Sequence, residues 1–90
     1  IRLLQEANFW VVGLSMDGEE TLFKEDMPPR VVIVIGAEGA GLGQAVAKSC
    51  DELRHIPMSG NTGSLNASVA AALALFEYTR SRSNWGISRR

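Results

Sequence analysis

The sequence predicts an α/β domain built around a parallel sheet. Two runs rich in β-branched residues, at 9–14 and 31–36, are apolar without alternation, which is typical of strands covered on both faces. A helical pattern at 42–49 separates the second run from a third, shorter run at 53–56. Strands joined through a helix are expected to run parallel, so these observations together indicate a βαβ unit.

The first third of the chain is predicted to be helix, strand and loop. Residues 2–7 have the pattern of a last helical turn, which Asn8 can end, and FWVVGL at 9–14 follows as a buried strand with Trp10 in the core. The next stretch, SMDGEETLFKEDMPP, contains the turn signal DG and the breaker PP. We expect a loop here, with a brief extended piece at Thr21–Phe23.

The remainder is predicted to alternate helix and strand. A helix is expected at 42–49, a strand at 53–56, and a long helix from Ser64 or Asn66 to about Arg82. Residues at helical spacing predict an apolar stripe on the long helix, made of Leu65, Val69, Leu73 and Phe76. Alanines at 70, 71, 72 and 74 would allow close packing, either with a neighbour in the same chain or with a second helix.

Composition sets further limits. The 90 residues suffice for one domain, and a net charge of −1 gives no general attraction to nucleic acid or anionic membranes. A single cysteine, Cys50, excludes a disulfide framework and a multi-cysteine zinc site, and is expected as a small apolar filler in a cytoplasmic protein. No apolar run approaches the roughly 20 residues of a membrane span. The chain opens without methionine, and we interpret it as a piece of a longer protein.

The glycine-rich turn after the second strand, IGAEGAGLG, does not match the common phosphate-binding motifs. Gly36 and Gly41 have the P-loop separation, but Leu42-Gly43 stands where lysine and a hydroxyl are needed. The alternating glycines do not fit the dinucleotide fingerprint either, because its third glycine falls one place early. Glu38 would repel a phosphate here, so the turn suits a ligand with positive charge unless Glu38 is a solvated loop carboxylate.

Two blocks together resemble a known family: IGAEGAGL at 35–42 and IPMSGNTGSLNASVAAALALFE at 56–77. They are similar to the second and third motifs of the SpoU-type RNA ribose 2′-O-methyltransferases, of the SPOUT superfamily. The motif order and the 20-residue step from Gly36 to Ile56 agree as well. The resemblance is strongest to bacterial 23S rRNA guanosine-2′-O-methyltransferases and covers about residues 1–83.

The resemblance implies a fold, a cofactor and partners. The fold would be the C-terminal portion of one methyltransferase domain, in which an α/β sheet carries a C-terminal trefoil knot. The cofactor would be S-adenosylmethionine, which has no phosphate and a positive sulfonium, in keeping with the missing lysine. Structured RNA, rRNA before tRNA, would be the substrate, and a homodimer the assembly. Residues 83–90 are expected to be a flexible basic tail.

The resemblance also assigns site residues, each with a simpler structural explanation. Backbone contacts to the cofactor would come from Gly36, Ile56 and Leu65, although core packing would explain the last two equally. Wall residues would be Leu14, Met58 and Gly60. The motif residues assigned to catalysis are Glu38, Ser64 and Asn66; the last two are also residue types that favour helix caps. His55, the only histidine, is expected on a strand.

The chain departs from the family in one respect. The first family motif, with an asparagine and the arginine thought to activate the ribose hydroxyl, has no counterpart in these residues. The 90 residues are therefore expected to hold the cofactor half of the machinery and to be inactive alone. A knotted dimerisation or RNA-binding module without chemistry is the alternative, and a small dinucleotide-binding domain is a third reading that the glycine spacing disfavours.

Overall fold

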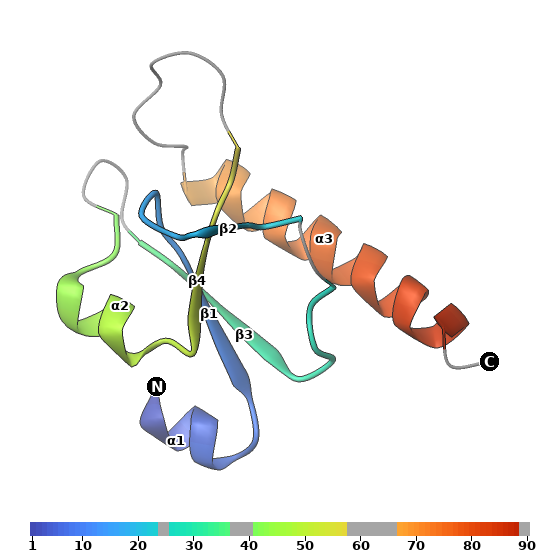
Figure 1. Cartoon of the computed structure of the whole chain (residues 1–90), viewed down its shortest axis with the longest axis horizontal. Helices are drawn as coiled ribbons and strands as arrows, with labels where there is room; N and C mark the ends of the chain where they lie inside the picture. Colours follow the sequence, from blue (N-terminus) through green and yellow to red (C-terminus); the bar gives the residue numbers. More distant parts are fainter. Residues whose placement is uncertain (24–25, 37–40, 58–66, 89–90) are drawn as a thin grey trace.

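A computed structural model describes residues 1–23, 26–36, 41–57 and 67–88 of the chain, with side chains as far as Arg82. Within these ranges the order of elements is helix, three strands, helix, strand, helix (Figure 1). Their bounds are α1 Arg2–Glu6, β1 Trp10–Leu14, β2 Glu20–Thr21, β3 Val31–Ile35, α2 Gln44–Ser49, β4 Glu52–His55 and α3 Ala67–Ser88. The predicted α/β class is confirmed, as is each predicted strand and helix, with β2 one residue earlier than expected.

The four strands form one parallel sheet in the order β2-β4-β1-β3. The central strand β1 pairs with β3 on one side, Trp10 opposite Val31 through Leu14 opposite Ile35. On its other side Leu14 lies opposite Arg54 of β4. The predicted parallel relation of the strands on either side of α2 is therefore confirmed, although β1 lies between them. Three carboxyl strand ends thus share one edge of the sheet, at the top of Figure 1.

Helix α1 ends at the asparagine that the sequence singled out. Asn8 has a φ of 71°, a left-handed conformation that asparagine tolerates better than most residues. Its N–H donates to the Gln5 carbonyl and that of Phe9 to the Leu4 carbonyl, both at 3.0 Å. This is the Schellman pattern of a helix C-terminus, and it turns the chain directly into β1.

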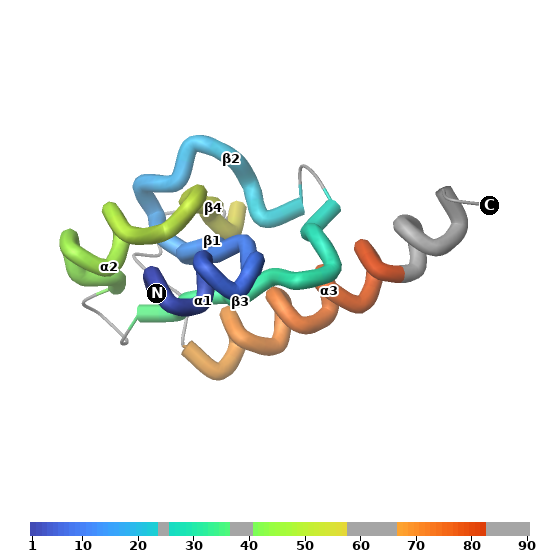
Figure 2. Tube along the Cα trace, turned by 90° about the horizontal axis from the view of Figure 1, so that it is seen from below, coloured from blue at the N-terminus to red at the C-terminus, as the bar shows by residue number. Residues whose placement is uncertain are grey.

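The core lies between the sheet and α3, which runs along β3 (Figures 1 and 2). Its buried members come from β1, the segment after it and α3, and the apolar side chains of β3 pack against them. They are Leu14, Leu22, Met27, Ala70 and Ala74. Of the two packing modes open to the alanines, the structure therefore shows the contact within the chain for Ala70 and Ala74.

The expected apolar stripe of α3 is wrong for two of its members. Val69 is 47% exposed and Phe76 is 68% exposed, while Leu73 packs against the core cluster. The buried face instead carries Ala70, Ala74, Glu77 and Ser81, and Leu65 lies outside the described residues. The hydrophobic pattern predicted the wrong face of α3 as the buried one. The reason is that α3 approaches the sheet closely, which favours small residues at the contact.

Two further expectations differ from the structure. Trp10 is not a core residue: it begins β1, is 42% exposed, and donates its Nε1–H to the Glu52 carboxylate at 2.9 Å. The last helix continues to Ser88, past the predicted end at Arg82. Neither proline nor any other strong breaker occurs in 83–88, and the glycine at 86 alone does not end the helix.

Gly18 permits a close crossing of the chain over β4. A Cβ atom added to Gly18 would lie 2.7 Å from the carbonyl carbon and 2.8 Å from the nitrogen of Arg54. The Arg54 backbone cannot move aside as the end of a flexible side chain could, so only glycine fits at this crossing. It brings the segment after β1 across to β2, on the far side of β4.

Candidate functional site at the carboxyl edge of the sheet

Three of the predicted cofactor-contacting residues lie at the same edge of the sheet. Leu14 is the last residue of β1, Gly36 follows β3, and Ile56 follows β4. Leu14 lies opposite Ile35 and Arg54, so Gly36 is one residue and Ile56 two residues beyond its partners. With about 4.8 Å between neighbouring strands, Gly36 and Ile56 flank Leu14 at roughly 10 Å from each other.

Leu14 and Ile56 give this edge an apolar floor. Leu14 is buried, and the half-buried Ile56 packs against the same core cluster. Both residues therefore have a packing role, which for Ile56 was the stated alternative to ligand contact. Packing does not exclude that contact, since both lie at strand ends, where the ligands of parallel sheets bind.

Gly36 begins a turn that closes tightly on itself. A Cβ atom on Gly36 would overlap the backbone of Gly41 and the nitrogen of Leu42. Gly41 has a φ of 69°, a conformation that glycine adopts at little cost. Backbone geometry therefore accounts for glycine at positions 36 and 41. Gly36 and Gly41 let the chain double back at the strand end and leave backbone groups accessible there.

The start of α3 lies beside this edge. The chain leaves β4 through Ile56 and Pro57 and is described again at Ala67, the first residue of α3. Ala70, one turn further on, is in the core cluster with Leu14, and Figure 1 shows the first turns of α3 near the carboxyl ends of the strands. The described boundaries of 58–66 therefore both lie at the predicted site.

Six predicted residues lie outside the described ranges, and their contacts stay predictions. They are Glu38, Met58, Gly60, Ser64, Leu65 and Asn66. The structure places their neighbours Gly36, Pro57 and Ala67, which fix where these segments begin and end.

Residues 15–23 and 26–30, between β1 and β3, form a segment that we name the strap. It leaves the sheet at the end of β1, and hydrogen bonds hold its first part to β4. The N–H of Ser15 donates to the Arg54 carbonyl at 3.0 Å, and that of Leu22 to the His55 carbonyl at 2.7 Å. The His55 ring Nδ1 lies 2.8 Å from the Gly18 carbonyl oxygen. His55 is thus a strand residue, as predicted, and its ring orients the strap.

Sequence reasoning missed two buried charged residues. Arg54 is 2% exposed and donates to the Leu22 carbonyl at 3.2 Å and to Glu52 at 3.0 Å. Glu77 is 1% exposed and pairs with Arg80 at 2.6 Å. Two features of the sequence could have indicated their burial. Arg54 lies inside a short predicted strand, and Glu77 has helical spacing from Ala70 and Ala74.

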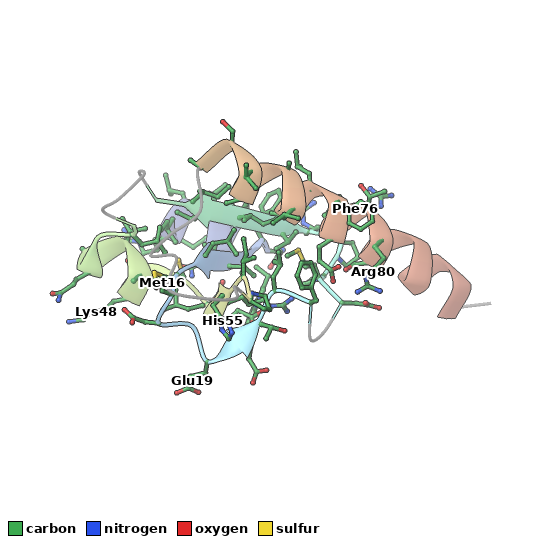
Figure 3. All side chains as sticks on the ribbon, turned by 90° about the horizontal axis from the view of Figure 1, so that it is seen from above. Met16, Glu19, Lys48, His55, Phe76 and Arg80 are labelled. Atoms are coloured by element: carbon green, nitrogen blue, oxygen red, sulfur yellow. The ribbon has the colours of Figure 1, made fainter. Side chains whose placement is uncertain are left out.

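An acidic hollow lies on another part of the surface. It has a volume of about 320 Å³ and is lined by Asp17, Glu19, Glu20, Glu52 and Leu53. Figure 3 shows Met16, Glu19 and His55 on the side away from α3. Because its carboxylates would repel the phosphates of a nucleic acid, this hollow is a poor candidate for an RNA contact.

Searches for metal ligands and membrane spans gave no candidates in the described ranges. No group of three or more His, Cys, Asp or Glu residues there could hold a metal ion. No helix in that part of the chain is long and apolar enough to cross a membrane.

The described part of the edge fits a cofactor with an uncharged aromatic ring and no phosphate. Leu14 and Ile56 offer apolar surface, and Gly36 brings backbone groups close to the strand end. The described residues of the edge, 14, 36, 41, 56 and 57, include no lysine or arginine that would bind a phosphate. S-adenosylmethionine, with its adenine and positive sulfonium, has the matching chemistry.

Comparison with protein families gives a match over residues 1–76 to the model described as the SpoU rRNA Methylase family. Among curated proteins, the chain is 46% identical over 82 residues to the 23S rRNA (guanosine-2′-O-)-methyltransferase RlmB of Salmonella typhi. That alignment covers 91% of this chain and 34% of the relative. The chain therefore spans about a third of the length of the curated relatives that it matches.

Solved structures agree with the sequence match. The SpoU methyltransferase AviRb of Streptomyces viridochromogenes, in complex with the cofactor AdoMet, superposes with a TM-score of 0.80 at 34% identity. The superposition covers 92% of this chain and 34% of AviRb. The TrmH/SpoU tRNA modifying enzyme of A. aeolicus superposes with a TM-score of 0.82 at 28% identity, over 99% of this chain and 46% of that enzyme.

Proposed function

The chain belongs to the SpoU rRNA Methylase family, and from this membership we propose that it is the cofactor-binding part of an RNA ribose 2′-O-methyltransferase. The observation that carries the proposal is the shared edge at which Leu14, Gly36 and Ile56 meet the start of α3. The carboxyl edge of a parallel sheet is where such folds bind ligands. S-adenosylmethionine is the proposed cofactor, supported by the AdoMet complex of the similar AviRb.

The bound cofactor would supply a methyl group on a positive sulfonium. When bound, it would supply this methyl group to a ribose 2′-oxygen and would be left as S-adenosylhomocysteine, while the hydroxyl proton would pass to a base. The work of the protein is to align oxygen, carbon and sulfur in line. We assign Gly36, Ile56 and Leu65 to backbone contacts with the cofactor, and Leu14, Met58 and Gly60 to the wall around it.

Glu38, Ser64 and Asn66 are assigned to the reacting end of the site. Glu38 stands in the glycine turn that follows Gly36, where a carboxylate complements positive charge. In the sequence Asn66 directly precedes Ala67, where α3 begins, and Ser64 is three residues before it; we assign both to positioning the ribose. The base that accepts the hydroxyl proton is expected from the first family motif, which has no counterpart in these 90 residues.

The substrate is proposed to be rRNA before tRNA. The identity to 23S rRNA methyltransferases, 46%, exceeds the 28% identity to the A. aeolicus tRNA modifying enzyme. In the same proposal the C-terminal part of the chain forms a trefoil knot, the whole of residues 1–90 is one portion of a single domain, and the protein is cytoplasmic.

A homodimer through α3 is part of the proposal. Val69, Leu75 and Phe76 of α3 are 47%, 64% and 68% exposed. Large apolar side chains that gather on one element in this way mark an interaction surface. A second copy of the chain is the proposed occupant, consistent with the homodimers that the family resemblance implies.

The first test is binding of S-adenosylhomocysteine to the full chain, followed by amide chemical shifts, with NAD as the control. The proposal expects S-adenosylhomocysteine to shift the amides of Gly36, Ile56 and Leu65, and NAD to leave them unchanged. A folded spectrum that ignores S-adenosylhomocysteine would support the scaffold module without chemistry. Shifts with NAD alone would support a dinucleotide site.

The second test is methyl transfer from S-adenosylmethionine to 23S rRNA and to tRNA by the full-length enzyme. Asn66→Ala is expected to lower the rate by about 100-fold, the lower range for loss of a positioned polar group near a reacting atom. Asn61→Ala, the same change in the same loop, is the matched control and should leave the rate within twofold. Equal rates in the two variants would remove Asn66 from the site.

A further inference from the structure

The contact face of α3 is unusually smooth. Ala70 and Ala74 are 7% and 2% exposed, and two turns further Ser81 is fully buried. Helices ordinarily fix their position along the axis by fitting ridges of side chains into grooves. Alanine and serine project little; of the larger residues of α3, Leu73 and Tyr78 also pack against the core cluster. At the small residues, apolar packing with Leu22 and Met27 defines the side of contact better than the position of α3 along its own axis.

Directional polar contacts are concentrated at the second half of this face. The Ser81 hydroxyl accepts the Met27 N–H at 3.0 Å, the Tyr78 hydroxyl donates to the Pro29 carbonyl at 2.9 Å, and Arg80 Nη2 donates to Asp26 at 2.8 Å. All three bonds connect α3 to residues 26–29 of the strap. Each has a narrow optimum in distance and angle, so together they define one position along the helix axis.

Glu77 organises this group. Its carboxylate, 1% exposed, accepts from Arg80 Nε at 2.8 Å and from Arg80 Nη2 at 2.6 Å. The two-point contact holds the guanidinium in the plane that reaches Asp26. The hydrogen bonds that Arg80 donates to Glu77 and Asp26 raise the pKa of Arg80, which stays charged. Figure 3 shows Arg80 along α3 on the part that carries Phe76.

The other end of the strap is held on β4. The Leu22 carbonyl accepts a hydrogen bond from the Arg54 guanidinium, and the Leu22 N–H donates to the His55 carbonyl. Leu22 and Met27 lie in one core cluster with Ala70 and Ala74, so the described parts of the strap connect β4, whose next residue is Ile56, with the second half of α3. Through α3 the connection reaches Ala67, directly after Asn66.

We propose that Asp26, Glu77, Tyr78, Arg80 and Ser81 form a register lock that sets the axial position of α3 relative to β4. Glu77 is its central positioning residue. The Glu77 carboxylate of the pair is buried, whereas the Arg80 side chain is 38% exposed. Fixing a register is the best-attested role of charged and polar groups held inside a packing face. A slip of one residue along a helix is about 1.5 Å, and errors of about 1 Å at a site can cost 100-fold in rate.

The consequence for the site rests on the proposed function, whereas the consequence for α3 does not. In the lock, Ile56 and Ala67, the residue that follows Asn66 in the sequence, keep a fixed separation because α3 and β4 are both tied to the strap. Without the lock, α3 can remain packed through Ala70 and Ala74 at more than one axial position. The site then loses cofactor affinity although the fold persists.

The test is the double variant Glu77→Met/Arg80→Met in the full chain. The matched control is Arg2→Gln/Glu6→Gln, which removes an exposed ion pair of α1 at 3.6 Å. Thermal midpoint, methyl–methyl NOEs from Ala70 and Ala74 to Leu22 and Met27, and the Kd for S-adenosylhomocysteine are measured on both. The lock variant is expected to keep its thermal midpoint within a few degrees and to change its NOE pattern. Its Kd for S-adenosylhomocysteine is expected to rise by about 10-fold or more, which is a tenth of the roughly 100-fold loss in rate that a misplacement of about 1 Å can cause.

An unchanged NOE pattern in the folded lock variant would overturn the proposal, as would a changed pattern in the control. If the lock variant changes its NOE pattern but the wild type does not bind S-adenosylhomocysteine, the lock is supported and the proposed function is wrong. Should the double variant be unfolded, Asp26→Ala/Tyr78→Phe leaves Glu77 and Arg80 paired and removes two bonds to the strap. Native NOEs in that variant would then count against the lock.

Discussion

The backbone N–H of Met27 donates to the hydroxyl of Ser81 at 3.0 Å, in a buried contact that joins residues 54 positions apart. Ser81→Ala removes the acceptor and leaves a buried N–H without it. The expected cost is about 1–3 kcal/mol in the free energy of unfolding, measured by urea denaturation. Ser49→Ala is the control, since the Ser49 hydroxyl is exposed and only bonds back to the Ala45 carbonyl. Equal effects of the two changes would contradict the burial of the Met27–Ser81 bond.

Gly18, the single glycine of the sequence from 15 to 30, is predicted not to tolerate replacement. Gly18→Ala places a methyl group 2.7–2.9 Å from the Arg54 backbone, so β4 and the strap must separate. Overpacking of this kind costs about 1–3 kcal/mol, which a thermal denaturation series would detect. Gly43→Ala is the matched control, because a Cβ there meets nothing within 4 Å and its φ is −67°. A midpoint for Gly18→Ala within one degree of that control would refute the close crossing.

Cys50 is predicted to make stability fall at alkaline pH. Burial, and secondly the charge of Asp51, raise the pKa of the Cys50 thiol above its ordinary 9.0 in the folded chain. The folded state therefore binds the thiol proton more tightly than the unfolded state. This contribution is complete below pH 9.0 and is lost as pH rises through the higher folded value. Urea midpoints from pH 7 to 10.5 should decline less in Cys50→Ser; parallel declines would argue against the assignment.

The exposed apolar residues of α3 predict the assembly state. Phe76→Glu should shift sedimentation of the full chain from dimer to monomer, because a charge would be buried against a second copy. Leu3→Glu is the control, since Leu3 of α1 is 78% exposed but lies on another element. A wild-type chain that is monomeric at all concentrations would remove the proposed dimer.

The strands could be predicted because continuous β-branched runs are typical of parallel sheets, VVIVI above all. The expectation that this run is covered on both faces is wrong, since β3 ends the described strand order and is half-buried throughout. The side of α3 that faces the sheet could not be predicted. Hydrophobicity ranks Val69 and Phe76 above alanine, but the close approach of α3 selects small residues, and a buried Glu77 is acceptable only with Arg80 beside it. The sheet order was equally hidden, since nothing in the sequence says that β1 lies between β3 and β4.

At the site, the motif spacing predicted where the strand ends meet, and Leu14, Gly36 and Ile56 do lie at one edge. The strap was read only as a loop. Its role depends on single contacts across the chain, such as Tyr78 to Pro29 and Arg54 to Leu22. Contacts of this kind have no periodicity and no local composition, so residue patterns do not reveal them.

The order β2-β4-β1-β3 also bears on how the chain folds. No two neighbours among the described strands are consecutive in sequence. Trp10 meets Val31 after 21 residues, Glu20 meets Arg54 after 34, and Val12 meets Glu52 after 40. A hairpin therefore cannot nucleate this sheet, and each pairing must first close a long loop, which slows folding. During synthesis, β1 emerges before β4 and gains its second partner only when β4 has left the ribosome.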